Sequence, residues 1–209
     1  MTNAAGGHST ATLYEASGVD CACDPGLRPA WPGARLAGPA YTVAGVGGDN
    51  LALHNAVATA PAGHVLVADL QSAAHGHWGE ILAVAAQLRG LPGLVIDGGV
   101  RDVAELARLR FPVFARTITA RGTGKQHPGG LGVPIMLGGI PVNTGDLVVA
   151  DDDGVIVLPR RDVAATVARA DDRVREERRI VGELHTGRTT LELYNLAPDG
   201  HSDRDGADD

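Results

Sequence analysis

Aromatic residues and cysteine are scarce in this sequence, and it has neither a basic cluster nor a long apolar run. Phe, Trp and Tyr make up only 3% of the 209 residues, so Ala, Val, Leu and Ile must build the core. The formal net charge is −7, and no group of Lys and Arg offers a surface that follows a phosphate backbone. Every apolar run is too short to cross a membrane. We therefore expect neither nucleic-acid nor membrane binding.

The two cysteines, Cys21 and Cys23, are separated by one residue. A disulfide between them would close a very small, strained loop, and two ligands do not complete a structural zinc site. The first residues also lack the basic segment and apolar run of a secretory signal. We expect reduced thiols in a cytoplasmic protein. The sequence assigns neither cysteine a role.

Helical and extended patterns alternate through the first part of the chain, and short strands follow. Apolar spacing and Gly or Pro breaks predict helices at 10–17, 50–59, 79–88, 100–110 and 162–184, strands at 40–46, 64–69, 93–97 and 113–116, an irregular connector at 25–39, and short strands between 132 and 159. This order predicts an α/β fold of mixed or stacked sheets with helices outside. We expect an N-terminal helix and connector at 1–33 and one domain at 34–196 that includes the C-terminal helix. A disordered acidic tail is expected at 197–209.

The segment from Val95 to Asp102 carries the most information about function. It reads as a buried strand, a turn at Gly98 and Gly99, and a helix that opens on Arg101 and Asp102. Open α/β sheets place ligands at the carboxyl ends of such strands. Arg can bind a carboxylate with two hydrogen bonds, and Asp can bind a hard cation such as Mg²⁺. The alternative is an aspartate that complements the dipole of its own helix beside a solvated arginine.

A second candidate site begins at Gly76 and ends at Glu80. Free backbone N–H groups at the start of the predicted helix would form an anion site. Glu80 could complement the helix dipole there, or it could relay a proton through water. The sequence alone does not place Glu80 near Asp102.

Other polar clusters have simpler interpretations. His75 and His77 lack a third metal ligand at matching spacing, so surface or hydrogen-bonded histidines are expected. The segment that ends in Lys125 lacks the spacing of a nucleotide-binding loop, which leaves Lys125 either solvated or facing a substrate. The run 151–153 is expected to form a hairpin turn rather than a calcium loop. No dinucleotide fingerprint and no serine-hydrolase elbow is present.

Six segments in the same order resemble the family that joins 4-hydroxy-4-methyl-2-oxoglutarate aldolase with the regulator of ribonuclease E activity A. The resemblance covers about residues 34–194. Its segments are Gly38–Val43, Gly48–His54, Trp78–Glu80, Asp97–Asp102, Gly138–Val142 and Gly145–Val155. Each segment is a weak signal alone, and their order carries the assignment.

This resemblance implies a β/β/α sandwich of the swivelling type that assembles as trimers or hexamers, with the active site between neighbouring subunits. It implies that Asp102 ligates Mg²⁺ or Mn²⁺ and that Arg101 holds the carboxylate of a pyruvyl group. Backbone N–H groups near Gly79, Ile81 and Leu82 assist in the same role. Glu80 matches an acidic residue that positions a water for proton transfer. A glutamate of the C-terminal helix, Glu176 or Glu177, would enter the neighbouring subunit's site.

The function that follows from the resemblance is cleavage of a 4-hydroxy-2-oxo acid to pyruvate and a carbonyl product, without a Schiff-base lysine. Decarboxylation of oxaloacetate, which passes through the same enolate, is the expected companion activity. The alternative is a non-catalytic protein that binds a ribonuclease or another protein. Glu80 favours the enzyme, because the regulator branch tends to lack a carboxylate there. The natural substrate, the choice of trimer or hexamer and the preferred metal stay open.

Overall fold

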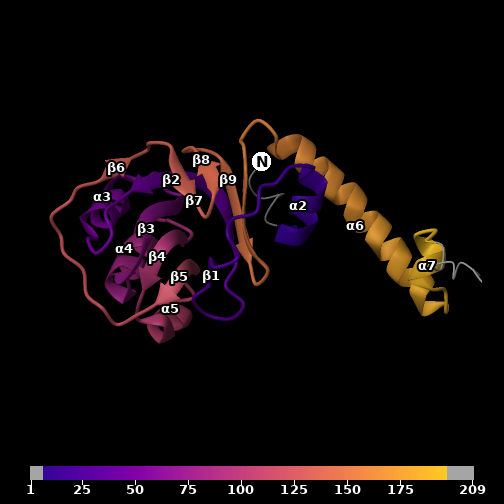
Figure 1. Ribbon diagram of the computed structural model, residues 1–209, viewed down its shortest axis with the longest axis horizontal. Helices are drawn as coiled ribbons and strands as arrows, with labels where there is room; N and C mark the ends of the chain where they lie inside the picture. Colours follow the sequence, from indigo (N-terminus) through magenta and orange to yellow (C-terminus); the bar gives the residue numbers. More distant parts are fainter. Residues whose placement is uncertain (1–6, 197–209) are drawn as a thin grey trace, which may run out of the picture. The chain divides into compact units, whose positions relative to one another are not determined.

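The computed structural model describes residues 7–196 (Figure 1). The predicted N-terminal segment 1–33 lies partly, and the predicted acidic tail 197–209 entirely, outside the described residues. In chain order the elements are α2 (Thr10–Ser17), β1 (Arg28–Pro29), β2 (Leu36–Ala44), α3 (Leu51–Thr59), β3 (Val65–Trp78), α4 (Glu80–Leu88), β4 (Leu94–Val100), α5 (Val103–Leu109), β5 (Val113–Ile118), β6 (Gly130–Leu131), β7 (Ile135–Leu137), β8 (Ile140–Val142), β9 (Leu147–Asp151), β10 (Gly154–Leu158), α6 (Val163–His185) and α7 (Thr190–Leu193).

Strand β2 joins two kinds of sheet. Its second half, Ala40–Ala44, pairs in parallel with β3, whereas its first half, Leu36–Pro39, pairs antiparallel with β9. The resulting mixed sheet has the order β1-β5-β4-β3-β2-β9-β10, with β6 also on β2, and the hairpin β7–β8 forms a separate two-stranded sheet. The expected α/β class is thus confirmed.

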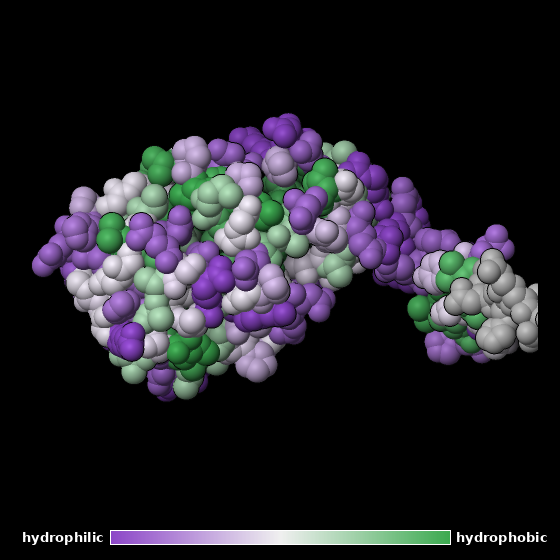
Figure 2. All heavy atoms as spheres, viewed as in Figure 1, coloured by the Kyte–Doolittle hydropathy of each residue, from purple (hydrophilic) through white to green (hydrophobic). Residues whose placement is uncertain are grey.

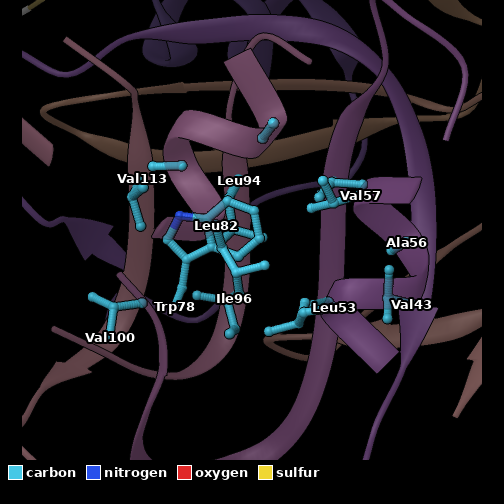
Figure 3. Close-up of a cluster of buried hydrophobic side chains, with 14 of the residues drawn as sticks. Val43, Leu53, Ala56, Val57, Trp78, Leu82, Leu94, Ile96, Val100 and Val113 are labelled. Carbon is cyan, nitrogen blue, oxygen red and sulfur yellow. The ribbon is translucent and has the colours of Figure 1, made fainter. Parts of the chain in front are cut away.

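Successive side chains of the parallel strands point to opposite faces of the sheet. Both sets are buried, because both faces are covered. One face packs on α3, α4 and α5, and Figure 3 shows Trp78, Leu82 and Ile96 together at its centre. Trp78 is fully buried and stacks on Phe111 with ring centroids 5.8 Å apart. The other face packs on the β7–β8 hairpin and the β9–β10 pair. Helices, parallel strands and antiparallel strands therefore form the layers of the expected β/β/α sandwich.

The N-terminal residues join this sandwich. Helix α2 ends at Gly18 in the left-handed conformation, as predicted, and its Leu13 packs with β9 and β10. Cys21 and Cys23 are buried and free, so no disulfide links them. Asp151 and Gly154 face each other across the turn between β9 and β10, which confirms the predicted hairpin.

The chain divides into two units, 1–170 and 171–209, and each is described by itself. The charged helix predicted at 162–184 is observed as α6 at Val163–His185. Within the second unit, Arg179 pairs with Glu176 and Arg173 pairs with Glu177. The α6 region is largely hydrophilic in Figure 2, as its alternating charges predict. Within residues 7–196, no helix combines the length and the apolarity that a membrane span requires.

Several predicted boundaries are wrong. Strand β4 runs through Gly98 and Gly99 to Val100, so these glycines lie within a strand rather than in a turn. Glycine occurs within this strand because its neighbours lie very close: a Cβ on Gly99 would lie 2.6 Å from the carbonyl oxygen of His75. Strand β3 is longer than predicted because register shifts let it follow β4 to Trp78.

Two further boundaries are corrected. The predicted connector 25–39 contains β1 and the first residues of β2, where pairing with neighbouring strands overrides the local Pro and Gly signals. The helix predicted from Val100 begins at Val103, because Asp102 has a left-handed backbone conformation.

Candidate active site

The carboxyl ends of β3 and β4 and the starts of α3 and α4 surround a small hollow of about 100 Å³ that opens to solvent. Its lining residues are Asn50, His54, Gly76, His77, Gly79, Ile81, Leu82, Arg101, Asp102 and Lys125. The structure therefore brings together five of the six site residues predicted to act within one subunit. The sixth, Glu80, has an exposed side chain that is not among these lining residues, although its backbone lies beside Asp102.

Arg101 and Asp102 follow directly after β4. The backbone N–H of Arg101 donates to the carbonyl oxygen of Trp78 at 2.9 Å, which continues the pairing of β4 with β3. The Arg101 Nε and Asp102 Oδ2 atoms are 3.7 Å apart, and the two side chains are 48% and 39% exposed. Both charged groups are thus available to a ligand at the mouth of the hollow.

Asp102 is held in a conformation that few residues adopt. Its backbone has φ of 57°, in the left-handed region that Asp tolerates better than most side chains. Although Asp102 occupies the N-cap position of α5, its carboxylate does not cap that helix. Instead, Asp102 Oδ2 accepts a hydrogen bond from the backbone N–H of Glu80, at the start of α4, at 3.1 Å. The carboxylate therefore faces the hollow rather than its own helix.

Two glycines allow the charged side chains to come this close to the backbone of β3. A Cβ on Gly79 would overlap Asp102 Oδ2, and a Cβ on Gly76 would lie 3.0 Å from Cδ of Arg101. Gly79 is the residue that precedes α4, so the helix start and the carboxylate share one narrow space. The N–H groups of Ile81 and Leu82 belong to the first turn, where no intrahelical acceptor exists. They suit an anionic group in the hollow.

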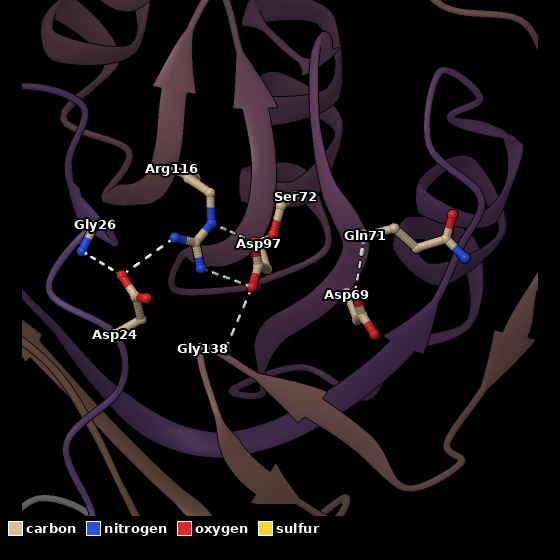
Figure 4. Close-up of polar contacts among 8 residues, drawn as sticks. All are labelled: Asp24, Gly26, Asp69, Gln71, Ser72, Asp97, Arg116 and Gly138. Atoms are coloured by element: carbon tan, nitrogen blue, oxygen red, sulfur yellow. Dashed lines mark hydrogen bonds and ion pairs between the residues drawn. The ribbon is translucent and has the colours of Figure 1, made fainter.

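Strand β4 is anchored on the other side of the sheet by Asp97 (Figure 4). Asp97 accepts hydrogen bonds from Arg116 Nε at 2.6 Å, Arg116 Nη2 at 3.0 Å and the Ser72 hydroxyl at 2.8 Å. Burial alone would raise the pKa of Asp97, but these donors outweigh burial and hold it below its usual value. Arg116 also pairs with Asp24 at 3.1 Å. This buried network fixes the strand that carries Arg101 and Asp102.

The sequence analysis did not place Asn50, His54 or His77 in the site. His77 is fully buried, its Nε2 accepts the N–H of Gly48 at 3.0 Å, and its Nδ1 lies 3.2 Å from the carbonyl oxygen of Gly99. This confirms the expectation of a hydrogen-bonded histidine. Burial also lowers the pKa of His77, which favours the neutral ring that these contacts require. The local sequence held no signal for this, because residues far apart in the chain meet here.

Lys125 is exposed and also lines the hollow, so it is solvated and within reach of a ligand bound there. Burial lowers the pKa of His54, and the positive charge of Lys125 lowers it further. With Arg101, the hollow therefore has two cationic side chains.

The donor set fits a hard divalent cation that takes few ligands from one chain. Among residues 7–196, no three His, Cys, Asp or Glu side chains are grouped as a metal cluster. Asp102 supplies one carboxylate beside the hollow, and Mg²⁺ commonly binds one or two carboxylates while water and substrate oxygens fill its other positions. Glu176 and Glu177 lie in the second unit, where both pair with arginines of their own helix.

Comparisons with known proteins show which family the chain belongs to. The model of the family described as "RraA-like: Aldolase/RraA" matches residues 10–157. A Halalkalibacterium halodurans protein named "Putative 4-hydroxy-4-methyl-2-oxoglutarate aldolase" is 36% identical over 156 residues, which cover 72% of this chain and 74% of that protein.

Solved structures agree at the level of the fold. An uncharacterized protein from Pseudomonas syringae superimposes with a TM-score of 0.83 at 30% identity, covering 93% of this chain and 96% of that one. The RNA-processing inhibitor RraA from Thermus thermophilis superimposes with a TM-score of 0.67 at 29% identity, covering 73% and 93%. The chain belongs to the RraA-like family, which includes relatives named as aldolases and relatives named as inhibitors of RNA processing.

Proposed function

We propose that this chain is a divalent-metal-dependent carbon–carbon lyase that cleaves a 4-hydroxy-2-oxo acid to pyruvate and a carbonyl product. The observation that carries the proposal is the position of Asp102. Its carboxylate leaves its own helix uncapped and instead lies beside Arg101 and the start of α4 in the hollow. An aspartate that served only as the N-cap of its own helix would accept N–H groups of α5.

In this proposal Arg101 binds the substrate carboxylate through two hydrogen bonds, and the free N–H groups of Ile81 and Leu82 assist it. Asp102 holds the cation, Mg²⁺ or Mn²⁺. When bound, the cation acts as a Lewis acid toward the 2-oxo group. Arg101 lies close enough to Asp102 to stabilise negative charge that develops on the same substrate.

Glu80 is assigned to proton transfer through a water, since its exposed side chain begins at the same helix start. The substrate hydroxyl at C4 gives up its proton through this water to the Glu80 carboxylate, and the C3–C4 bond breaks as the new carbonyl forms. The electron pair of that bond becomes the pyruvate enolate, which takes a proton back from Glu80 through water at C3 to give pyruvate. Loss of carbon dioxide from oxaloacetate leaves the same enolate, so decarboxylation is part of the proposal.

The assembly is also proposed from the family. A cytoplasmic homotrimer, or a hexamer of two trimers, would bring Glu176 or Glu177 of one subunit to the site of the neighbouring subunit.

The experiment for the activity measures pyruvate release from 4-hydroxy-4-methyl-2-oxoglutarate and from oxaloacetate, with Mg²⁺, with Mn²⁺ and with EDTA. Release that EDTA abolishes supports the proposal, and release that persists in EDTA contradicts the metal-dependent mechanism.

A non-catalytic role remains the second candidate, because the chain superimposes on an RNA-processing inhibitor of the same family. An exposed apolar stripe on α4, formed by Ile81, Val84 and Leu88, suits contact with another protein. Saturable binding to a ribonuclease by purified protein that releases no pyruvate from either oxo acid would favour this function.

A further inference from the structure

A second cavity lies at the opposite end of strand β3 from the candidate active site. Its volume is about 400 Å³, against about 100 Å³ for the hollow at the carboxyl ends of β3 and β4. It is lined by residues of β2, β9 and the start of α6, and by His64, which directly precedes β3. The hollow instead reaches Gly76 and His77, near the other end of that strand. The two cavities share no residue, so the proposed lyase reaction makes no use of the second one.

Most of the wall of the second cavity is apolar. Pro39 of β2 and Leu147 of β9 are directly paired in the antiparallel part of the sheet, and Leu147 is buried. Val163 and Ala164, in the first turn of α6, complete the apolar lining. Cavities of this size with apolar walls and a few polar groups are typical of small-molecule sites. This wall therefore suits the hydrocarbon part of a ligand.

Arg160 brings a positive charge to the second cavity. Its backbone N–H donates to Oδ1 of the buried Asp146 at 3.0 Å, which fixes the chain at this point. Gly145 leaves room beside it, since a Cβ there would lie 4.0 Å from Cδ of Arg160. Within residues 7–196, no carboxylate pairs with the Arg160 guanidinium, whereas the next residue, Arg161, pairs with Asp162 at 3.6 Å. The guanidinium of Arg160 is thus available to a ligand.

His64 supplies the second polar group. Its Nδ1 atom is buried and has no hydrogen-bond partner in the part of the chain that the structure describes. The backbone around it is held, because the N–H of His64 donates to the carbonyl oxygen of Pro61 at 3.3 Å and that of Gly63 to Gly90 at 2.8 Å. A buried polar atom without a partner is costly, and native structures nearly always supply one. The free nitrogen in the wall of a cavity therefore indicates a polar group of a ligand.

The start of α6 favours a negative charge on that ligand. The first N–H groups of a helix have no intrahelical acceptor and carry positive partial charge. Val163 and Ala164 belong to this first turn, which contains no acidic residue. An anionic group placed between the helix start and Arg160 would be stabilised by both.

We propose that the second cavity binds a carboxylic acid with an apolar body. The carboxylate contacts the Arg160 guanidinium and Nδ1 of His64, and the hydrocarbon part lies on Pro39, Leu147 and Val163. An arginine matches a carboxylate through two parallel hydrogen bonds, and one guanidinium balances a single negative charge. The inference does not depend on the proposed lyase reaction.

Calorimetric titration of the purified full chain tests the proposal with three probes, all in EDTA so that no cation draws carboxylates to the hollow. Hexanoate has the charge and the apolar body, hexanamide has the body without the charge, and acetate has the charge with almost no body. We expect hexanoate to bind about 10-fold more tightly than hexanamide or better, as for a charge-assisted hydrogen bond. It should exceed acetate by about 10-fold or more, because acetate buries few methylene groups. Equal binding of hexanoate and acetate, or no binding of hexanoate at millimolar concentration, overturns the inference.

Two variants test the polar groups. Arg160→Met removes the charge and keeps the aliphatic stem, so the preference for hexanoate over hexanamide should fall to about 2-fold or less. Its matched control is Arg161→Met, because the Arg161 side chain is 84% exposed and does not line the cavity; this variant should keep the wild-type preference. His64→Phe keeps a ring and loses both nitrogens, so it should weaken hexanoate binding about 3-fold or more. A preference that Arg160→Met leaves intact contradicts the assignment of the carboxylate.

A third variant tests the location without removing a polar group. Ala164 is exposed and lines the cavity, so Ala164→Phe should fill the space and abolish hexanoate binding while α6 still forms. Ala165→Phe, at the next exposed position but outside the lining, should bind hexanoate as the wild type does. If Ala164→Phe also binds hexanoate normally, the ligand lies elsewhere, for instance on Arg101, and the inference is overturned even if pyruvate release is found. Binding that depends on Arg160 and Ala164, in protein that releases no pyruvate, supports the inference while the proposed catalysis fails.

Discussion

The carboxylate of Asp102 accepts the backbone N–H of Glu80 at 3.1 Å, although Asp102 itself begins a different helix, α5. Two helix starts, those of α4 and α5, thereby meet at one carboxylate at the end of β4. A negative charge at the start of α4 is favourable because that helix end carries positive partial charge. The same placement leaves the carboxylate 39% exposed and beside Arg101, where a cation and an oxo acid can reach it.

Substitution Asp102→Asn should separate the charge of this residue from its structural contact. The amide oxygen can still accept the N–H of Glu80, so we expect the melting temperature to change by only a few degrees, equivalent to about 1 kcal/mol. Metal-dependent pyruvate release should fall about 100-fold or more, because a neutral amide is a poor ligand for Mg²⁺. Steady-state assays at several Mg²⁺ concentrations test this. Activity near the wild-type level would remove Asp102 from the metal site.

Gly79→Ala should damage the site more than the fold. The backbone at Gly79 is extended, with φ of −160°, so alanine can adopt it without strain. Its Cβ would nevertheless overlap Asp102 Oδ2 and push the carboxylate away from its place. We expect pyruvate release to fall about 100-fold, as for a displacement of about 1 Å in a catalytic group.

Gly182→Ala serves as the control for that variant, since a Cβ there meets no atom within 4 Å. It should leave pyruvate release unchanged. If Gly79→Ala keeps full activity, or loses it only through unfolding seen by circular dichroism, the close approach of Gly79 to Asp102 has no functional importance.

The sequence predicted most elements that depend on local patterns. Helix α2 and its end at Gly18, helices α3 and α4 within one residue of their starts, and the hairpin at Asp151 all follow from capping, spacing and turn residues. The long β3 and the continuation of β4 through Gly98 and Gly99 were missed. They depend on which strand lies alongside, and a single chain does not reveal that neighbour.

The site residues also divide into those that the local sequence predicts and those that depend on packing between distant parts of the chain. Arg101 and Asp102 were identified because they are adjacent and follow a buried strand. Asn50, His54 and Lys125 reach the hollow from other parts of the chain, and only the packing of α3 and the 119–129 segment brings them there. No feature of the Gly122–Lys125 stretch indicates that the buried Asp49 carboxylate accepts the backbone N–H of the next residue, Gln126.

Stability should decrease between pH 7 and pH 5 through His77. Burial lowers the pKa of His77 in the folded protein below the ordinary value of 6.5. Stability is therefore complete above pH 6.5, and it falls as the unfolded chain begins to bind a proton that the folded chain excludes. For one such group the slope is at most about 1.4 kcal/mol per pH unit.

Denaturant unfolding of wild type and His77→Gln at several pH values measures this effect. Glutamine can still accept the N–H of Gly48, but it does not titrate, so the slope of the variant should be smaller than that of the wild type. The His54→Gln variant is measured in parallel, because the pKa of His54 is lowered too. Identical slopes in wild type and His77→Gln would mean that His77 does not titrate abnormally.

The ion pair between Asp97 and Arg116 should be the costliest of the chain's tested pairs to break. Asp97 is 7% exposed and accepts two hydrogen bonds from Arg116. Asp97→Ala leaves the Arg116 side chain, which is 22% exposed, with Asp24 as its one remaining ion-pair partner among residues 7–196. Removing one partner of a buried pair costs about 3–5 kcal/mol. By contrast, Arg108→Ala breaks the exposed pair with Glu105 and should cost less than about 1 kcal/mol.

The same pair predicts the direction of acid unfolding. The folded pKa of Asp97 lies below the ordinary value of 3.8, so its contribution is complete above that pH and is lost as the pH falls further toward the folded pKa. Wild type should therefore lose stability below pH 3.8 with a slope that Asp97→Asn reduces, while Asp97→Asn is already less stable at pH 7. Equal acid slopes in both proteins would show that Asp97 titrates normally, and a cost at pH 7 no larger than that of Arg108→Ala would show that the buried network does not anchor β4.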